Sequence, residues 1–212
     1  MPAEFVTAQI DSVFSDLNVD AVKIGMVAQP ATIAAIAAGL ACWSPRHVVL
    51  DPVMVATSGD RLLAEQAVAA LRTKLIPRAS LITPNLPEAA ALLDEPIAES
   101  EAEIQRQGKR LLQMRCAAVL IKGGHGKGAE SVDYLITASE VIALAAPRIA
   151  TRNTHGTGCS LSSAIAAGLA KGEGMETALR HAKAWVSAAI AAADRLAVGK
   201  GHGPIHHFHR FY

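Results

Sequence analysis

The chain has 212 residues, a formal net charge of +1 and three cysteines, and 51% of its residues are hydrophobic. That length suffices for one well-buried core, so we expect a single domain over residues 1–212. Nucleic-acid binding needs clustered Lys and Arg that displace counterions, and a net charge near zero argues against it. The expected partner is therefore a small molecule.

The cysteines and the hydropathy indicate a reducing, aqueous setting. Cys42, Cys116 and Cys159 are odd in number, widely spaced and without a CxxC pair, unlike a disulfide framework. The most apolar stretch, 31–43, is too short and too rich in alanine to span a bilayer. We expect a cytoplasmic protein without a signal peptide or a membrane segment.

The hydrophobic pattern predicts helices that alternate with strands. In chain order it predicts a helix at 5–17, a strand at 20–25, a helix at 30–43, a strand at 47–50, a helix at 63–75, a strand at 80–83, helices at 87–93 and 100–114, a strand at 117–121, a hairpin-like pair at 132–137 and 141–144, and helices at 157–171 and 175–196. The strands are continuous apolar runs, typical of parallel strands buried on both faces. The expected fold class is therefore α/β, with a mostly parallel central sheet.

Polar residues follow the middle strands of this predicted sheet. Asp51 follows the strand at 47–50, Asn85 and Glu88 follow the strand at 80–83, and Lys122 follows the strand at 117–121. Ligands of open parallel sheets bind beyond the carboxyl ends of the strands. Oxygen ligands suit Mg²⁺, directly or through water, and a lysine suits a phosphate. The alternative is that Asp51 and Asn85 only cap helices and turns.

A glycine-rich turn precedes the helix predicted at 157–171. It contains Gly156, Thr157 and Gly158, followed by Cys159. The unpaired backbone N–H groups at such a helix start can hold an anion, including a phosphoryl group in transfer. A thiol in the first turn of a helix tends to have a lowered pKa. Taken alone, the same residues also fit an ordinary helix start with a core cysteine.

Five segments together resemble a known family. DPVMVATSGDRLL, TPNLPEA, VLIKGGH, NTHGTGCSLSSAIAAGLA and GKGHGPIHHFH occur in the order found in the hydroxymethylpyrimidine and phosphomethylpyrimidine kinases of thiamine biosynthesis. These enzymes belong to the ribokinase-like superfamily. The resemblance implies a three-layer α/β/α sandwich, a homodimer, and the use of ATP and Mg²⁺. The implied reaction phosphorylates 4-amino-5-hydroxymethyl-2-methylpyrimidine and then converts its monophosphate to the pyrophosphate.

The resemblance also implies roles for individual residues. Gly156, Thr157 and Gly158 match the anion hole, and Cys159 stands where ribokinase-like sugar kinases have an aspartate base. A thiolate there would accept the hydroxyl proton in the first phosphorylation, whereas the second needs no base. Asp51 and Glu88 match metal-side positions.

The remaining matches concern the two substrates. Lys122, Asn85 and Glu88 match the side that holds the ATP phosphates, and Met26 and Val53 match the pyrimidine pocket. Thr57 stands where the family often has lysine. Lys183 is expected either to reach the nucleotide or, as the plainer interpretation, to be solvated on its helix. We expect the histidines at 202, 206, 207 and 209 to belong to the family's C-terminal tail rather than to a zinc site, because their spacing matches no zinc motif.

The resemblance does not extend to the family's N-terminal segment, because Met1–Val6 aligns with an internal stretch of the family. The expected sheet is therefore N-terminally incomplete, with an exposed strand edge. A misplaced start codon, a natural truncation and pairing of the edge with another chain would each explain this. The alternatives to an active pyrimidine kinase are a pyridoxal kinase-like enzyme and a truncated, non-catalytic nucleotide-binding form.

Overall fold

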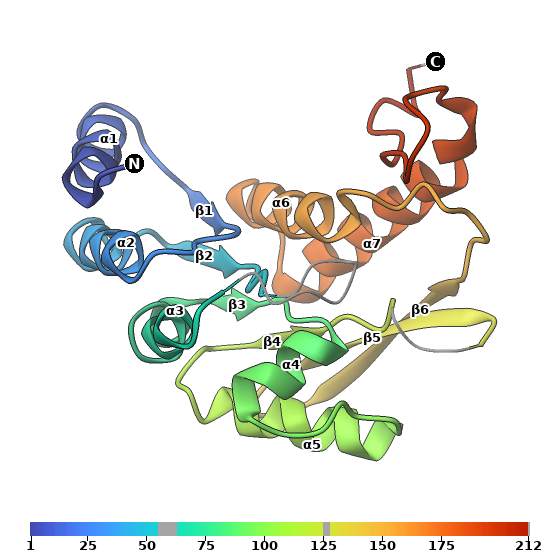
Figure 1. Ribbon diagram of the computed structural model, residues 1–212, viewed down its shortest axis with the longest axis horizontal. Helices are drawn as coiled ribbons and strands as arrows, with labels where there is room; N and C mark the ends of the chain where they lie inside the picture. The colour runs from blue at the N-terminus through green and yellow to red at the C-terminus, as the bar shows by residue number, and fades with distance from the viewer. Residues whose placement is uncertain (55–62, 125–127, 212) are drawn as a thin grey trace.

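A six-stranded sheet forms the centre of the computed structural model, which describes residues 1–54, 63–124 and 128–211 (Figure 1). The strands lie in the order β1 (Ala21–Ile24), β2 (His47–Leu50), β3 (Leu81–Ile82), β4 (Val119–Ile121), β5 (Glu130–Ile136) and β6 (Val141–Pro147). β1 to β4 are parallel, and β5 and β6 are antiparallel. The predicted mostly parallel sheet and its hairpin-like pair are confirmed.

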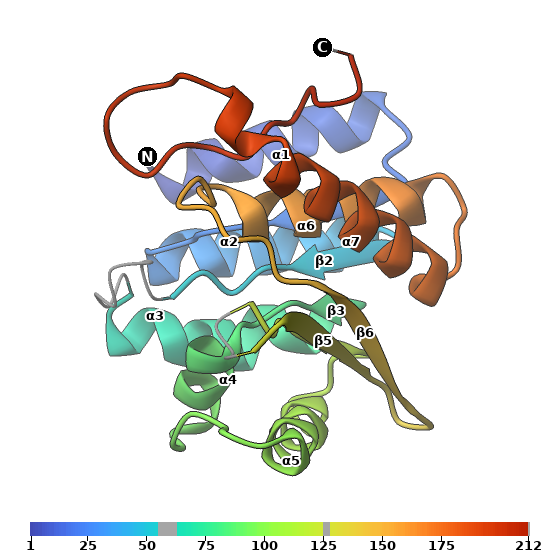
Figure 2. The same cartoon turned by 90° about the vertical axis from the view of Figure 1, so that its right-hand side faces the viewer.

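Helices cover both faces of the sheet (Figure 1). One layer contains α2 (Pro30–Trp43), α3 (Glu65–Ala70), α4 (Leu86–Leu93) and α5 (Glu101–Leu112), and the other contains α6 (Thr157–Ala170) and α7 (Met175–Ala191). A further helix, α1 (Ala3–Asp16), packs outside α2, as the view turned by 90° also shows (Figure 2). Within the described part of the chain, no helix combines the length and apolarity needed to cross a membrane.

Two apolar cores lie on the two faces of the sheet. Val48 and Leu50 of β2 pack with the residues of α2 to α5, whereas Val49 packs with those of α6 and α7. Successive side chains of a strand point to opposite faces, so each strand contributes to both cores. This double burial explains why the strands are continuous apolar runs.

Local sequence signals account for most helix boundaries. Pro30 occupies the first turn of α2, where its missing N–H removes no helical hydrogen bond. Asn85 and Glu88 form a capping box at the start of α4, and Ser100 and Glu103 form another at the start of α5. Each box satisfies two backbone N–H groups that lack a partner within the helix.

The helix predicted at 63–75 is wrong in part. The α-helix covers only Glu65–Ala70, and a π turn at Leu71–Leu75 and a 3₁₀ turn at Ile76–Arg78 follow it. Pro77 has no N–H, and its ring crowds the carbonyl group four residues earlier, so the regular hydrogen bonding cannot continue. The helix predicted at 175–196 likewise ends earlier, at Ala191, and a 3₁₀ turn at Ala193–Arg195 follows.

Candidate active site

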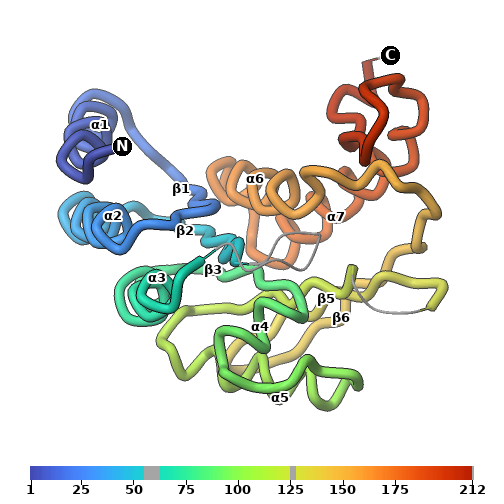
Figure 3. The backbone as a smooth tube through the Cα atoms, viewed as in Figure 1, coloured from blue at the N-terminus to red at the C-terminus, as the bar shows by residue number. Residues whose placement is uncertain are grey.

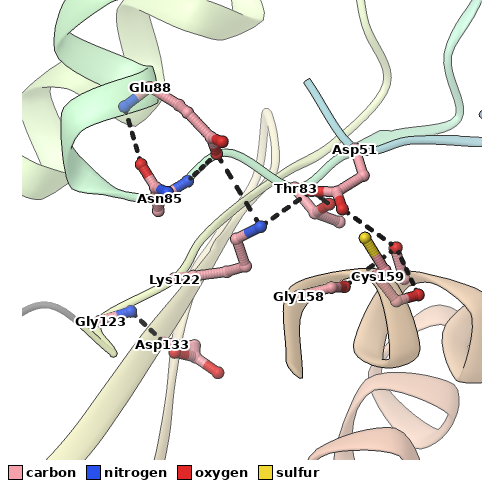
Figure 4. Close-up of polar contacts among 10 residues, drawn as sticks. Asp51, Thr83, Asn85, Glu88, Lys122, Gly123, Asp133, Gly158 and Cys159 are labelled. Atoms are coloured by element: carbon pink, nitrogen blue, oxygen red, sulfur yellow. Dashed lines mark hydrogen bonds and ion pairs between the residues drawn. The ribbon is translucent and has the colours of Figure 1, made fainter. Parts of the chain in front are cut away.

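Charged and polar side chains from three neighbouring strands meet at the carboxyl edge of the sheet (Figure 4). Lys122, after β4, places its Nζ 2.8 Å from Oδ1 of Asp51, after β2, and 3.8 Å from Oε2 of Glu88. Thr83, after β3, donates its hydroxyl to Oδ1 of Asp51 at 3.1 Å. The structure thus brings these strand ends together, and Thr83 is an additional member of the cluster.

The backbone holds Lys122 and Asn85 side by side. The Lys122 N–H donates to the Pro84 carbonyl oxygen at 2.9 Å, which extends the pairing of β3 and β4. Oδ1 of Asn85 accepts the Glu88 N–H, and Oε2 of Glu88 accepts the Asn85 N–H, each at 2.8 Å. Asn85 is thus a helix cap, as the alternative interpretation predicted. This cap also aims the Glu88 carboxylate at Lys122.

The cluster holds two carboxylates against one ammonium in a buried setting. The exposed fraction of the side chain is 1% for Asp51, 3% for Glu88 and 14% for Lys122. Burial raises the pKa of Glu88, the Lys122 ammonium lowers it, and the Asp51 carboxylate raises it; the net direction is upward. The excess of carboxylates favours a further cation at this edge.

The glycine-rich turn at the start of α6 lies against the same cluster. Gly156 adopts φ of +83°, which favours glycine, and its carbonyl oxygen accepts the Ser160 N–H at 2.9 Å. A Cβ placed on Gly158 would stand 3.2 Å from Nζ of Lys122. The first N–H groups of α6 therefore lie beside the lysine, in an arrangement that suits an anion.

Cys159 and Ser162 lie in the first turns of α6. Cys159 is exposed and borders a groove of about 860 Å³ between α6 and α7. The Ser162 hydroxyl stands 3.0 Å from the Gly158 carbonyl oxygen and 3.4 Å from Oδ2 of Asp51. Ser162 thereby links the glycine turn to the carboxylate after β2. By contrast, burial raises the pKa of the Cys116 thiol to about 11, which disfavours the reactive thiolate.

A segment near the C-terminus braces the loop that leads into α6. The tube in Figure 3 shows this segment returning beside the loop, and the N–H of His155 donates to the carbonyl oxygen of Gly203 at 3.1 Å. The Gly203 N–H donates to Oδ1 of Asn153 at 2.9 Å. A Cβ on Gly203 would stand only 2.5 Å from that oxygen. The loop therefore depends on a glycine about fifty residues away in the chain.

The histidines of this segment make local contacts. His207 places Nε2 2.8 Å from the Ser160 hydroxyl oxygen, in the first turns of α6. The rings of His207 and His209 lie 6.0 and 5.8 Å from the ring of Trp185. Nδ1 of His209 lies 3.1 Å from the His206 carbonyl oxygen. These contacts attach the segment to α6 and α7.

The structure describes three of the four other residues singled out from the sequence, Met26, Val53 and Lys183. Met26 follows β1 and has an exposed fraction of 58%, and Val53, two residues after Asp51, is half-buried. Thr57 lies outside the described residues. Lys183 on α7 is 11% exposed and places Nζ 2.6 Å from Oδ2 of Asp133. The interpretation of Lys183 as a solvated lysine is therefore wrong, because its side chain is largely buried and its ammonium is paired with Asp133 of β5.

Sequence reasoning did not single out Asp133, although it gives a signal. Asp133 stands inside the apolar run of β5 and is 5% exposed. Buried carboxylates need a charged or hydrogen-bonding partner. A carboxylate within a buried strand therefore indicates a partner elsewhere in the chain.

The same fold occurs in solved vitamin kinases. The Bacillus subtilis pyridoxal kinase in an ADP complex is similar with a TM-score of 0.92 and 31% identity, over 100% of this chain and 79% of that one. The phosphomethylpyrimidine kinase of Clostridium difficile 630 is similar with a TM-score of 0.79 and 36% identity, over 90% and 77%. The chain thus has the ribokinase-like α/β sandwich of small-molecule kinases.

Sequence comparison assigns the family. The phosphomethylpyrimidine kinase family model matches residues 1–206. The hydroxymethylpyrimidine/phosphomethylpyrimidine kinase of Rhizobium meliloti (strain 1021) is 57% identical over 210 residues, which cover 99% of this chain and 79% of that relative. This chain belongs to the phosphomethylpyrimidine kinase family.

Proposed function

We propose that the protein transfers the γ-phosphoryl group of ATP to 4-amino-5-hydroxymethyl-2-methylpyrimidine and then a second phosphoryl group to the resulting monophosphate. The observation that supports this most directly is the position of Lys122. Its ammonium lies beside the glycine turn of α6 and between the carboxylates of Asp51 and Glu88. A cation next to unpaired backbone N–H groups suits a phosphoryl group in transfer.

The residues of the site divide between ATP, the transferred phosphoryl group, the metal ion and the pyrimidine. Lys122, with Asn85 and Glu88, takes the phosphate side of ATP, and the N–H groups of the 156–158 turn hold the transferred group. Asp51 and Glu88 would hold Mg²⁺, directly or through water, and the ion would supply positive charge to the ATP phosphates. Met26 and Val53, at the same edge of the sheet, face the pyrimidine.

Cys159 acts as the base of the first transfer only. The substrate hydroxyl oxygen forms a bond to the γ-phosphorus, the bond from that phosphorus to the bridging oxygen of ADP breaks, and the hydroxyl proton passes to the Cys159 thiolate. In the second transfer, an ionised oxygen of the monophosphate attacks another γ-phosphorus. That oxygen carries no proton to remove, so the thiolate has no role there.

An assay that detects both products tests the proposal. Purified protein with ATP and Mg²⁺ is expected to convert the hydroxymethylpyrimidine to its monophosphate and then to the pyrophosphate, and Lys122→Met is expected to abolish both steps. Pyridoxal is the comparison substrate, because the TM-score of 0.92 to a pyridoxal kinase favours it as a second candidate. Faster turnover of pyridoxal than of the pyrimidine would overturn the first proposal. Thermal stabilisation by MgATP without product would instead indicate a nucleotide-binding form.

The proposed setting is a single-domain homodimer in the cytoplasm. The position of β1 at one end of the strand order supports self-association, since an edge strand offers backbone groups to a second chain. Cys42, Cys116 and Cys159 are free thiols, as a reducing compartment favours. Light scattering on the purified protein tests the dimer: a monomeric mass at micromolar concentration would contradict it.

A further inference from the structure

A buried ion pair lies beneath the segment that carries Lys122. Oδ2 of Asp133, on β5, accepts from Nζ of Lys183, on α7, at 2.6 Å. Oδ1 of the same carboxylate accepts the N–H of Gly123 at 2.8 Å, as Figure 4 shows. The two charged side chains are 7% and 11% exposed. One carboxylate thus connects α7 to the residue next to Lys122.

The Gly123 backbone is held from a second side as well. A Cβ on Gly123 would stand 1.8 Å from the carbonyl oxygen of Val132, so the chain here presses directly against β5. The N–H of Lys122 is bonded to the Pro84 carbonyl oxygen at 2.9 Å. Between these contacts the main chain has little freedom, and the hydrogen bond to Asp133 sets the orientation of the peptide that joins Lys122 to Gly123.

We propose that Asp133 and Lys183 are positioning residues for Lys122, acting through the N–H of Gly123 rather than by touching the nucleotide. This inference rests on the proposed function, in which Lys122 holds the ATP phosphates. Lys183 supplies the counter-charge of the buried Asp133 carboxylate and holds it in place from α7. The carboxylate oxygen in turn accepts the Gly123 N–H and thereby fixes the peptide beside Lys122.

The contacts of Lys183 argue against a direct role at the nucleotide. Its Nζ is already engaged with Asp133, and its side chain is largely buried. If the ammonium turned toward a nucleotide phosphate, a buried carboxylate would lose its counter-charge, which is strongly unfavourable. A buried ion pair also adds little stability over well-packed apolar side chains, so stability alone gives no reason for a charged pair here.

A comparison of single and double variants separates positioning from direct contact. Lys183→Met removes the ammonium and leaves Asp133 without its counter-charge, and kcat/KM for MgATP is expected to fall roughly 10- to 100-fold. The double variant Asp133→Asn with Lys183→Met is neutral and keeps an oxygen that can accept the Gly123 N–H. We expect it to return to within roughly threefold of the wild type, a coupling typical of contacting residues. KM for the pyrimidine is expected to stay unchanged throughout.

A matched control comes from an exposed ion pair on the same helix. Arg180 and Glu176 of α7 lie 2.6 Å apart, with side chains about half exposed (53% and 47%). Glu176→Gln with Arg180→Met removes one charge of each sign, as the double variant does, but away from Gly123, and is expected to leave kcat/KM for MgATP unchanged. A loss equal to that of Lys183→Met would show that the loss of any ion pair on α7 impairs the enzyme, and would overturn the inference.

The outcomes distinguish this inference from the proposed function. A double variant as defective as Lys183→Met would mean that the ammonium itself contacts the nucleotide, which overturns the inference. If Lys183→Met alone does not fold, the double variant still tests the inference. Binding of MgATP like that of the wild type supports the inference, and weaker binding overturns it.

Hydrogen exchange at the Gly123 amide gives a readout that needs no nucleotide. Exchange is expected to be slow in the wild type and the double variant, and faster in Asp133→Ala. Equal exchange in all three overturns the inference. Wild-type protein that shows slow exchange but binds no MgATP contradicts the proposed function and leaves the link from Asp133 to Gly123 supported.

Discussion

Replacing Lys122 by methionine removes the ammonium that lies between Asp51 and Glu88, while the methionine keeps most of the aliphatic volume. The two ion-pair distances are 2.8 and 3.8 Å. At an effective dielectric constant of about 20, these correspond to Coulomb attractions of about 6 and 4 kcal/mol. The desolvation of the ammonium offsets much of this attraction.

The expected loss of stability follows from what the variant leaves behind. Breaking a buried ion pair by removing one partner typically costs about 3–5 kcal/mol, because the remaining charge is unpaired. For a domain of this size, that loss lowers Tm by about 6–20 °C. The loss is expected to shrink as the pH falls through the folded pKa of Glu88, which burial raises above 4.5, because this carboxylate then takes up a proton.

Urea denaturation at pH 7 and at pH 5 measures the effect, with Lys122→Met/Asp51→Asn as the matched control. The double variant is expected to regain most of the stability without regaining kinase activity, since it has lost one buried negative charge but still lacks the cation that we propose binds the ATP phosphates. A loss below about 1 kcal/mol for Lys122→Met at pH 7, the value typical of an exposed pair, would refute the reasoning.

Three further predictions concern the proposed base Cys159, the buried carboxyl group of Glu88, and Gly203 in the segment that supports the loop into α6. Cys159→Ala is expected to slow the first phosphorylation roughly 100- to 10,000-fold, the range for loss of a general base, and to spare the second; equal losses in a two-substrate assay would contradict the assigned role. Burial raises the pKa of Glu88 above its ordinary value of 4.5 in the folded protein. The folded protein therefore binds a proton at Glu88 more tightly than the unfolded chain does, which stabilises the fold fully below pH 4.5. This stabilisation is lost as the pH rises through the folded pKa. The difference in unfolding free energy between the wild type and Glu88→Gln, measured by urea denaturation, is therefore expected to fall as the pH rises from 4 to 8. A difference that does not change with pH would show that Glu88 is solvated. Gly203→Ala is expected to cost about 1–3 kcal/mol of stability and to lower kcat, because its Cβ displaces Asn153; the control Gly201→Ala, which meets nothing within 4 Å, is expected to leave both unchanged, and equal effects of the two would argue against the brace.

Much of the fold could be predicted because local signals and tertiary packing agree. The helix at 30–43 and the strand at 47–50 have the predicted bounds, since proline begins the helix and Asp51-Pro52 ends the strand. The region after residue 70 could not be predicted as well. Its apolar spacing is helical, but Pro77 perturbs hydrogen bonds several residues upstream, and the resulting π turn has no periodicity of its own.

The site was predictable where its residues follow strands and less so where it depends on contacts between distant elements. Asp51 and Lys122 stand at strand ends, and the rule for parallel sheets brings such ends together. The pairing of Asp133 with Lys183 depends on how α7 lies relative to the strands of the sheet, which the spacing of either segment does not specify. The same holds for the bond from Gly203 to Asn153.

The brace between residues 153–155 and 203–205 has a consequence for protein synthesis. A ribosome makes Asp51, Lys122 and the glycine turn well before it makes Gly203, so a growing chain can build the sheet and both charged strand ends while the loop into α6 lacks its support. Kinase activity should therefore appear only after residue 207 has left the exit tunnel and docked on α6. Messages that lack the codons for this segment would yield a polypeptide whose loop into α6 is unsupported, and a fusion partner joined close to Gly203 would act directly on the 156–158 turn, which we propose holds the phosphoryl group.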